Sequence, residues 1–414
     1  MVTLIKFVIF ASIYIGLIAT SFFILSFLSS KKEKKKLFKE NELPDVSVII
    51  PAYNEEKSIE TTFKSILDSD YPKNKLEIVF VDDGSTDDTL KIAKKFESKR
   101  VHIFSKENEG KGTALNFGLK KVKGEIIFTM DADTFVHKRS LKKMVRYFKN
   151  PEVMCVSPAI TIHNPKSFLQ RIQYMEYLLG LFLRKAFASV NAIHITPGAF
   201  SAYRKTFFDK YGDYEVGNLT EDLEMSFRVQ VKGYIIENAP EAPVYTIAPS
   251  KFSHLLKQRR RWYIGLMKNT WKYREVFSPK YGDLGIFVLP ISWISIFFAV
   301  FITTYLFFKT LFNVRDELLF FQSINFDLGS ILSINSYFIE RSLFLFLSNP
   351  IVIFILFFMV FFGFYLIYAS KKVGKIMDWY INLPLFFLFF AILFGFWWIV
   401  SIIYMVFYGE VSWK

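Results

Sequence analysis

The chain has 414 residues, of which 52% are hydrophobic and 49 are phenylalanine, and its mean hydropathy is positive, at +0.27. This apolar and aromatic content excludes a wholly soluble protein and predicts a membrane part beside a polar part. Lysines on the cytoplasmic side of a membrane explain the net charge of +14, and without a nucleic-acid-binding module we expect no nucleic-acid partner. Cys155 is the only cysteine, which excludes an internal disulfide and a cysteine-based metal site.

The first predicted membrane span, at residues 4–28, is apolar apart from Lys6 and exceeds the ~20 residues needed to cross a bilayer. The sequence KKEKKK follows it directly, at residues 31–36. A signal peptide carries its positive charge before the apolar core and a cleavage site after it, whereas here the order is reversed. We therefore expect residues 1–30 to form an anchor whose C-terminal end lies in the cytoplasm.

A polar region at residues 44–278 precedes a C-terminal membrane region at 279–414. The latter has three apolar stretches of spanning length, at residues 284–308, 343–370 and 381–408. With four spans, the positive-inside rule places KKEKKK, the polar region and the lysines at 371–375 on one side, the cytoplasmic side. We expect a multi-pass protein of the cell membrane, in contact with membrane lipids, with both termini outside.

Short β-branched runs alternate with helical stretches in the first half of the polar region. The runs lie at residues 46–53, 76–83, 101–105 and 125–133, and the helical stretches between them at 58–69, 87–98 and 112–122. This alternation predicts an α/β fold with right-handed βαβ units and a parallel sheet covered on both faces. Ligands of such sheets bind beyond the carboxyl ends of the strands.

Polar clusters follow three of the predicted strands, at residues 53–55, 82–83 and 131–133. In the last, Asp131 and Asp133 are two positions apart, so on an extended segment both carboxylates point the same way and can approach one cation. Oxygen ligands suit Mg²⁺ or Mn²⁺, which would also take phosphate oxygens from a nucleotide. Ordinary acidic loop residues and helix caps are the alternative explanation.

Other polar residues suggest further parts of a nucleotide site. A carboxylate of Asp82 or Asp83 could accept a hydrogen bond from a base N–H, and Lys111, between two glycines at a helix start, could reach a phosphate. Thr220 has the features of a helix cap, with Glu221 and Asp222 in the first turn, where the helix dipole favours acidic side chains. The functional alternative is that Asp222 is a general base beside the nucleotide.

Six segments, in order and at suitable intervals, resemble the membrane-embedded family 2 glycosyltransferases, which include the cellulose, hyaluronan and poly-N-acetylglucosamine synthases. They are PAYNEE (51–56), VDDGSTDDT (81–89), GKGTALNFG (110–118), DAD (131–133), TED (220–222) and QRRRW (258–262). The resemblance covers roughly residues 44–275, and the membrane spans fit the layout of the family. It implies a Rossmann-like GT-A fold that uses a nucleotide-activated sugar, usually UDP-linked, with inversion at the anomeric carbon.

The resemblance also implies roles for individual residues. Asp133, helped by Asp131, would hold Mg²⁺ or Mn²⁺ on the diphosphate, and Asp222 would take the proton from the acceptor hydroxyl. Glu221, Arg261 and Trp262 complete the expected catalytic set. The expected substrate-binding residues are Ala52, Tyr53, Asn54, Glu55, Asp82, Asp83, Lys111, Asp131, Gln258, Arg261 and Trp262. The segment ITPGAFSAYRK (195–205) occupies the place of the family's acceptor-contacting segment, with Pro197–Gly198 in place of the Cys-Gly of some members.

Two helices are expected to place the site near the bilayer. In QRRRW, Gln258, Arg261 and Trp262 share one helical face, on which Arg261 can meet the leaving diphosphate and Trp262 an acceptor sugar. Arg259 and Arg260 point elsewhere and are expected to meet lipid headgroups or acidic loops. The stretch 167–190 predicts an amphipathic helix, either at the membrane interface or packed on the sheet.

Two enzymatic hypotheses and one binding hypothesis follow. The first is a membrane glycosyltransferase that extends a β-linked polysaccharide from a UDP-sugar and could pass it through its own spans. The second adds a single sugar to a lipid such as a polyprenyl phosphate or a ceramide-like acceptor. The third, a scaffold protein without catalysis, conflicts with the full set of carboxylates and the QRRRW motif.

Overall fold

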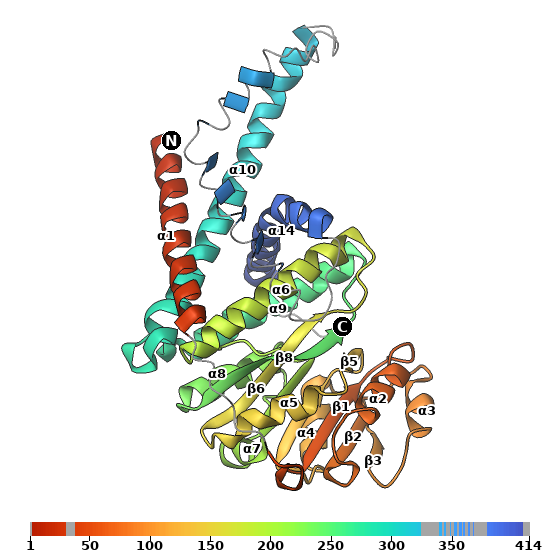
Figure 1. Cartoon of the computed structure of the whole chain (residues 1–414). Helices are drawn as coiled ribbons and strands as arrows, with labels where there is room; N and C mark the ends of the chain where they lie inside the picture. Colours follow the sequence, from red (N-terminus) through yellow and green to blue (C-terminus); the bar gives the residue numbers. More distant parts are fainter. Residues whose placement is uncertain are drawn as a thin grey trace.

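The computed structural model describes residues 2–29, 38–323 and 379–408, with scattered residues between 339 and 367. An N-terminal helix, α1 (Val2–Ser29), leads into an α/β domain, which is followed by the long helices α10 (Leu289–Ser323) and α14 (Trp379–Tyr408). Figure 1 shows the three long helices on one side of the α/β domain. The α/β fold joined to membrane helices is the one predicted from the sequence.

An eight-stranded sheet forms the centre of the described part of the α/β domain, in the order β3-β2-β1-β4-β7-β6-β8-β5. The strands are β1 (Val46–Ala52), β2 (Leu76–Asp82), β3 (Val101–Ser105), β4 (Ile126–Met130), β5 (Thr134–Val136), β6 (Val153–Ile162), β7 (Phe200–Arg204) and β8 (Ile235–Thr246). Strands β1 to β4 are mutually parallel, as predicted. The sheet as a whole is mixed, because β7 runs antiparallel to β4 and β6, and β5 runs antiparallel to β8.

Apolar side chains of the central strand β1 alternate between the two faces of the sheet. Val48 and Ile50 pack on one face in a cluster that includes Phe63 of α2 (Ile59–Leu67), whereas Ile49 packs on the other face with Leu115 of α4 (Lys111–Leu119). All seven residues of β1 are buried. This burial on both faces explains why the strand is a nearly continuous apolar run in the sequence. The shorter helices are α3 (Thr89–Lys94), α5 (Ser140–Val145), α7 (Lys205–Tyr211) and α8 (Glu221–Val231).

Helices α6 (Phe168–Ser189) and α9 (Phe252–Lys272) lie between the sheet and the membrane helices (Figure 1). The side chain of Ser167 caps α6, and the helix ends at Val190, so its predicted bounds are confirmed. One core cluster joins residues of α6 to Ala159 of β6 and to Phe386 of α14. The alternative of packing on the sheet is therefore confirmed, and α6 also packs on a candidate membrane helix, whereas its position at the membrane interface stays a prediction.

Three described helices are long and apolar enough to cross a membrane: Phe7–Leu28, Leu284–Ser323 and Tyr380–Tyr408. The second of these was expected to end at residue 308 but continues to Ser323, and its 40 residues correspond to roughly 60 Å of helix. The predicted span at 343–370 lies largely outside the described residues. The other three predicted spans thus coincide with helices, and they support a membrane protein.

Candidate active site

Hydrogen bonds connect the loops that follow β1 and β2 at the carboxyl edge of the sheet. The backbone N–H of Asn54 donates to Oγ of Ser85 (3.0 Å), and the N–H of Thr86 donates back to Oδ1 of Asn54 (2.8 Å). The N–H of Glu55 donates to Oγ1 of Thr89 (2.7 Å). Asn54 has a positive φ of 56°, a conformation that asparagine tolerates better than most residues. These hydrogen bonds therefore fix the conformation of the segment from Ala52 to Glu55, which was predicted to contact the nucleotide. Within this segment the side chain of Tyr53 is exposed.

Asp82, at the end of β2, is almost fully buried, and its carboxylate has partners within the protein. Its Oδ1 accepts from the N–H of Ser85 (3.3 Å) and its Oδ2 from Oγ of Ser105 (2.9 Å). These bonds tie the end of β2 to the end of β3. The structure thus shows that Asp82 links the ends of two strands by hydrogen bonds, and its predicted contact with the base stays a prediction.

Asp83 organises the approach to α4. Its carboxylate accepts from the ammonium of Lys106 (2.9 Å) and from the N–H of Gly110 (2.8 Å), the residue before the first turn of α4. A Cβ on Gly84 would lie 2.9 Å from the backbone N of Asn108, so this glycine permits a close approach between two loops of the protein itself. Asp83 therefore fixes the start of α4, and with it the position of Lys111.

Lys111 brings the GKG, DAD and TED segments together. Its Nζ lies 2.7 Å from Oδ1 of Asp131 and 3.0 Å from Oε1 of Glu221. Burial by itself would lower the pKa of Lys111, but the carboxylates of Asp131, Glu221 and Asp222 outweigh burial and raise the pKa well above its usual range. Segments that are 90 residues apart in sequence thus meet at one ammonium group, which stays charged.

The DAD segment is a turn and not the extended strand end that was predicted. The backbone N–H of Thr134 donates to the carbonyl of Asp131 (3.1 Å), which turns the chain from β4 into β5, and the N–H of Asp131 donates to the carbonyl of Ala199 (2.9 Å). Asp131 and Asp133 therefore do not lie on one extended segment, and the prediction that their carboxylates point the same way for that reason was wrong. Asp131 and Asp133 are nevertheless electrostatic neighbours: removal from water, then the charges of Asp131 and Glu55, raise the pKa of Asp133 to about 7.

Asp222 lies in the first turn of α8, where its Oδ1 accepts from the N–H of Leu223 (2.8 Å). Burial and the neighbouring charge of Glu221 raise the pKa of Asp222 to about 6, against the opposing effects of Lys111 and Arg261. Gly198 lies against this carboxylate, because a Cβ on residue 198 would come within 2.6 Å of Oδ2 of Asp222. The predicted acceptor-contacting segment is thus in direct contact with the predicted base.

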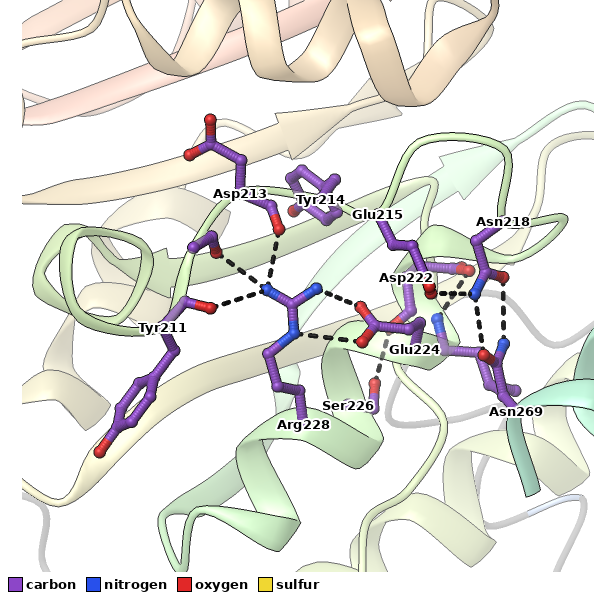
Figure 2. A network of polar contacts seen from close by, with 12 residues as sticks. Tyr211, Asp213, Tyr214, Glu215, Asn218, Asp222, Glu224, Ser226, Arg228 and Asn269 are labelled. Carbon is purple, nitrogen blue, oxygen red and sulfur yellow. Dashed lines mark hydrogen bonds and ion pairs between the residues drawn. The ribbon is translucent and has the colours of Figure 1, made fainter. Parts of the chain in front are cut away.

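Thr220 occupies the N-cap position of α8, as predicted, but its side chain does not cap the helix. Its Oγ1 instead accepts from Nδ2 of Asn269 in α9 (3.0 Å), and Asn269 and Asn218 exchange side-chain hydrogen bonds (Figure 2). A Cβ on Gly265 would lie 2.3 Å from Oγ1 of Thr220. Helix α9 therefore packs directly on the TED turn, at a glycine that leaves no room for a side chain.

A second group of polar contacts in Figure 2 holds the rest of α8. Glu224 is fully buried and pairs with Arg228 one turn later, and it also accepts from the hydroxyl of Tyr273 at the end of α9. Arg228 donates further to the backbone carbonyls of Gly212 (2.9 Å) and Asp213 (2.8 Å). None of these residues was predicted from the sequence, and together they fix the helix that carries Asp222.

Helix α9 carries the predicted Gln258, Arg261 and Trp262. The charge of Arg261 contributes to lowering the pKa of Asp222, which places the two groups within electrostatic reach. The Oε1 atom of Gln258 is buried and has no hydrogen-bond partner within the described residues. A buried amide oxygen without a partner is unusual in a protein and is available to a ligand donor. These features are consistent with the predicted site, whose residue roles remain predictions.

The structure corrects the expectation for Arg259, which is buried, whereas the contact of Arg260 with lipid headgroups stays a prediction. Arg259 is 3% exposed and forms a two-pronged ion pair with Glu176 of α6, at 2.6 and 2.8 Å. The guanidinium of Arg260 lies 3.9 Å from the ring centroid of Tyr404 in α14. Neither side chain meets an acidic loop, because α6 and α14 both pack against α9. Glu176 could have been noticed as the only acidic residue of α6.

The mixed sheet and its covering helices form a fold of the GT-A type, joined to helices long and apolar enough to cross a membrane. Residues 47–212 match the family described as glycosyl transferase family 2, so the chain contains a domain of this family and the resemblance seen in the sequence is confirmed. The match does not extend over the TED and QRRRW segments. The structure brings Glu221 of the TED segment to the ammonium of Lys111, which also meets Asp131, and it places Arg261 within electrostatic reach of Asp222.

Curated relatives and a solved structure agree with this assignment. The poly-beta-1,6-N-acetyl-D-glucosamine synthase of Staphylococcus aureus (strain COL) is 30% identical over 262 residues, which are 62% of this chain and 63% of the relative. The synthase of the same name from Staphylococcus epidermidis is 30% identical over 268 residues, 61% of this chain and 63% of the relative. The chain thus aligns with about 63% of the length of these relatives. A mannosyltransferase from Pyrobaculum calidifontis, PcManGT, solved with GDP-Man and Mn2+, superposes with a TM-score of 0.54 at 20% identity, covering 88% of this chain and 98% of that one, and supports the predicted fold.

Proposed function

We propose that the chain is a membrane polysaccharide synthase, an inverting transferase that moves a sugar from a UDP-sugar to the hydroxyl of a growing β-linked polysaccharide. The observation that carries this proposal is the meeting of Asp131 and Glu221 at the ammonium of Lys111. This contact joins the DAD segment, proposed to lie on the donor side, to the TED segment, proposed to lie on the acceptor side. The names of the curated relatives make N-acetylglucosamine the first sugar to test.

Asp131 and Asp133 would hold Mg²⁺ or Mn²⁺ in this proposal. Burial, and after it the charges of the neighbouring carboxylates Asp131 and Glu55, raise the pKa of Asp133, so a cation beside these groups would be favourable. A hard cation such as Mg²⁺ is commonly held by one or two carboxylates and completes its shell with substrate phosphate oxygens and water. When bound, such an ion supplies Lewis-acid stabilisation to the leaving diphosphate.

Side chains of the protein are proposed to carry out the remaining parts of the transfer reaction. Asp222, with a pKa of about 6, is ionised at neutral pH and is proposed to accept the proton of the acceptor hydroxyl as that oxygen attacks the anomeric carbon. Positive charge develops at that carbon in the transition state of glycosyl transfer, and the neighbouring carboxylates stabilise it. Arg261 is proposed to meet the diphosphate and Trp262 the acceptor ring. Lys111 keeps Glu221 and Asp131 in place and holds down the pKa of Asp222.

We extend the proposal to the topology of the chain. The described membrane helices would act together with the predicted span at 343–370, so that the catalytic domain lies in the cytoplasm and both termini lie outside. The positive-inside rule and the lysines at 31–36 and 371–375 support this arrangement. Reporter fusions at the two termini test it, and a cytoplasmic C-terminus would contradict it.

The experiment that tests the function is a product screen. The purified full chain is incubated with radiolabelled UDP-sugars, first UDP-N-acetylglucosamine, with Mn²⁺ or Mg²⁺. A high-mass product that a glycosidase degrades supports the synthase, and an organic-extractable product identifies a single-sugar lipid transferase instead. No turnover of any nucleotide sugar, with or without added lipid, would contradict both. Asp222→Asn serves as the control, and it should bind UDP without transferring sugar.

A further inference from the structure

The ion pair between Glu176 and Arg259 joins α6 to α9, the helix that carries QRRRW. Both carboxylate oxygens of Glu176 accept from the guanidinium, at 2.6 and 2.8 Å, which is the planar fork geometry that only arginine provides. The side chain of Arg259 is 3% exposed and that of Glu176 is 23% exposed. The pair is therefore an internal contact of the protein and not a pair of charges in solvent.

Burying a charged side chain of this kind is costly unless its partner compensates it fully. Two apolar residues in these positions would join α6 and α9 without that cost. The ion pair differs from an apolar contact in one respect: it fixes the plane and the position of the guanidinium.

The guanidinium of Arg259 lies over the indole of Trp262, with 4.5 Å between its central carbon and the ring centroid. Such a contact is favourable because the ring face carries negative electrostatic potential, and it strengthens when water is excluded. Arg259 thus covers one face of the indole and restricts the rotation of the ring. A sugar ring that stacks on Trp262 must use the opposite face.

We propose that Glu176 is a positioning residue of the acceptor site, which sets the orientation of the Trp262 indole through Arg259. The inference rests on the proposed function, because it takes Trp262 as the surface on which the acceptor sugar stacks. Glu176 touches neither donor nor acceptor in this scheme. Through the contact between Glu176 and Arg259, the affinity for the growing product depends on the position of α6 between the sheet and the membrane helices.

The first test measures the orientation without any substrate. The chain contains seven tryptophans, so full-length protein labelled with 5-fluorotryptophan gives at most seven ¹⁹F resonances in detergent, and the one lost in Trp262→Phe belongs to Trp262. In Glu176→Gln, and in Arg259→Lys as a second variant, this resonance should shift or broaden. Glu241→Gln is the matched control, because it removes the ion pair to Arg146 (3.1 Å), which involves neither α6 nor α9. A Trp262 resonance unchanged in both variants would overturn the proposal.

The second test measures the consequence for the product. Glu176→Gln should hold the growing chain roughly threefold to tenfold less well, as expected when one aromatic contact is loosened, and so release shorter polymer while its affinity for UDP stays the same. Polymer of wild-type length would overturn the acceptor role even if the resonance moves. If the wild-type chain makes no polymer, the proposed function fails and the acceptor role with it, whereas the resonance still reports whether Glu176 orients Trp262.

Discussion

Gly198 lies so close to the carboxylate of Asp222 that a Cβ on residue 198 would come within 2.6 Å of Oδ2. Real Cβ atoms do not approach an oxygen this closely, so any side chain at residue 198 must displace the carboxylate or the backbone that supports it. The position of the proposed base is thus set partly by the absence of a side chain opposite it.

Gly198→Ala should therefore lower kcat about 10- to 100-fold, because small displacements of a catalytic group are costly, while UDP binding stays near the wild-type value. Steady-state kinetics and UDP titration measure the two quantities. Gly180→Ala is the control, since the atoms nearest to a Cβ there belong to the guanidinium of Arg184, the nearest of them at 3.3 Å, and not to a carboxylate. Wild-type kcat in Gly198→Ala would show that Asp222 is not placed by this contact.

The rate should depend on pH through Asp222. Its pKa of about 6 lies well above that of an ordinary aspartate, so it becomes protonated, and loses its function as a base, as the pH falls through this value. A pH profile of kcat/KM should show an acid limb near pH 6. Asp222→Asn should retain UDP binding and lose transfer, and transfer retained at all pH values would refute the assignment.

Removing the positive charge of Lys111 should shift the pH of the acid limb in the kcat/KM profile. Lys111 lowers the pKa of Asp222, so Lys111→Met should shift the acid limb of kcat/KM to higher pH and reduce the rate at neutral pH by roughly 10- to 100-fold. Lys111→Arg, which keeps the positive charge, should leave the limb closer to its wild-type position. Identical profiles for the methionine variant and the wild type would contradict the electrostatic role.

The pH dependence of the stability of the metal-free protein should report the ionisation of Asp133. Its folded-state pKa of about 7 exceeds the ordinary value, so between about pH 4 and pH 7 the folded state binds more protons than the unfolded state and stability falls as pH rises. Mn²⁺ should therefore raise the Tm more at pH 8 than at pH 5. Asp133→Asn should flatten the pH dependence of Tm and abolish metal-dependent UDP binding. Metal-dependent UDP affinity equal to that of the wild type would exclude Asp133 as a ligand.

Sequence periodicity predicted the elements whose residues face the core in a regular way. β1 is buried along its whole length, and α6 begins after its Ser167 cap and ends at Val190, as predicted. β8 escaped prediction because Pro240 and Pro243 interrupt it and its pairing with β6 shifts register at Pro158. A strand with such interruptions has no two-residue apolar alternation to detect.

The candidate site could be predicted as a set of residues but not as a geometry. The DAD segment was expected to be extended, and it turns because Asp131 bonds to the backbone of Ala199 and Thr134, partners that local sequence does not specify. The pair between Glu176 and Arg259 escaped for a similar reason. Helical spacing shows which residues share a face, but tertiary packing decides what covers that face.

Helix α9 is also attached to a membrane helix. Tyr263, next to Trp262, stacks on Trp398 of α14 with 4.5 Å between ring centroids and an angle of 6° between planes, and Arg260 lies over Tyr404 of the same helix. The tilt of a membrane helix is set by its packing against neighbouring helices and by aromatic and basic anchors at the interface. A displacement of α14 would thus reach α9, so the helix that carries the proposed acceptor residue Trp262 is mechanically continuous with a helix long and apolar enough to cross a membrane.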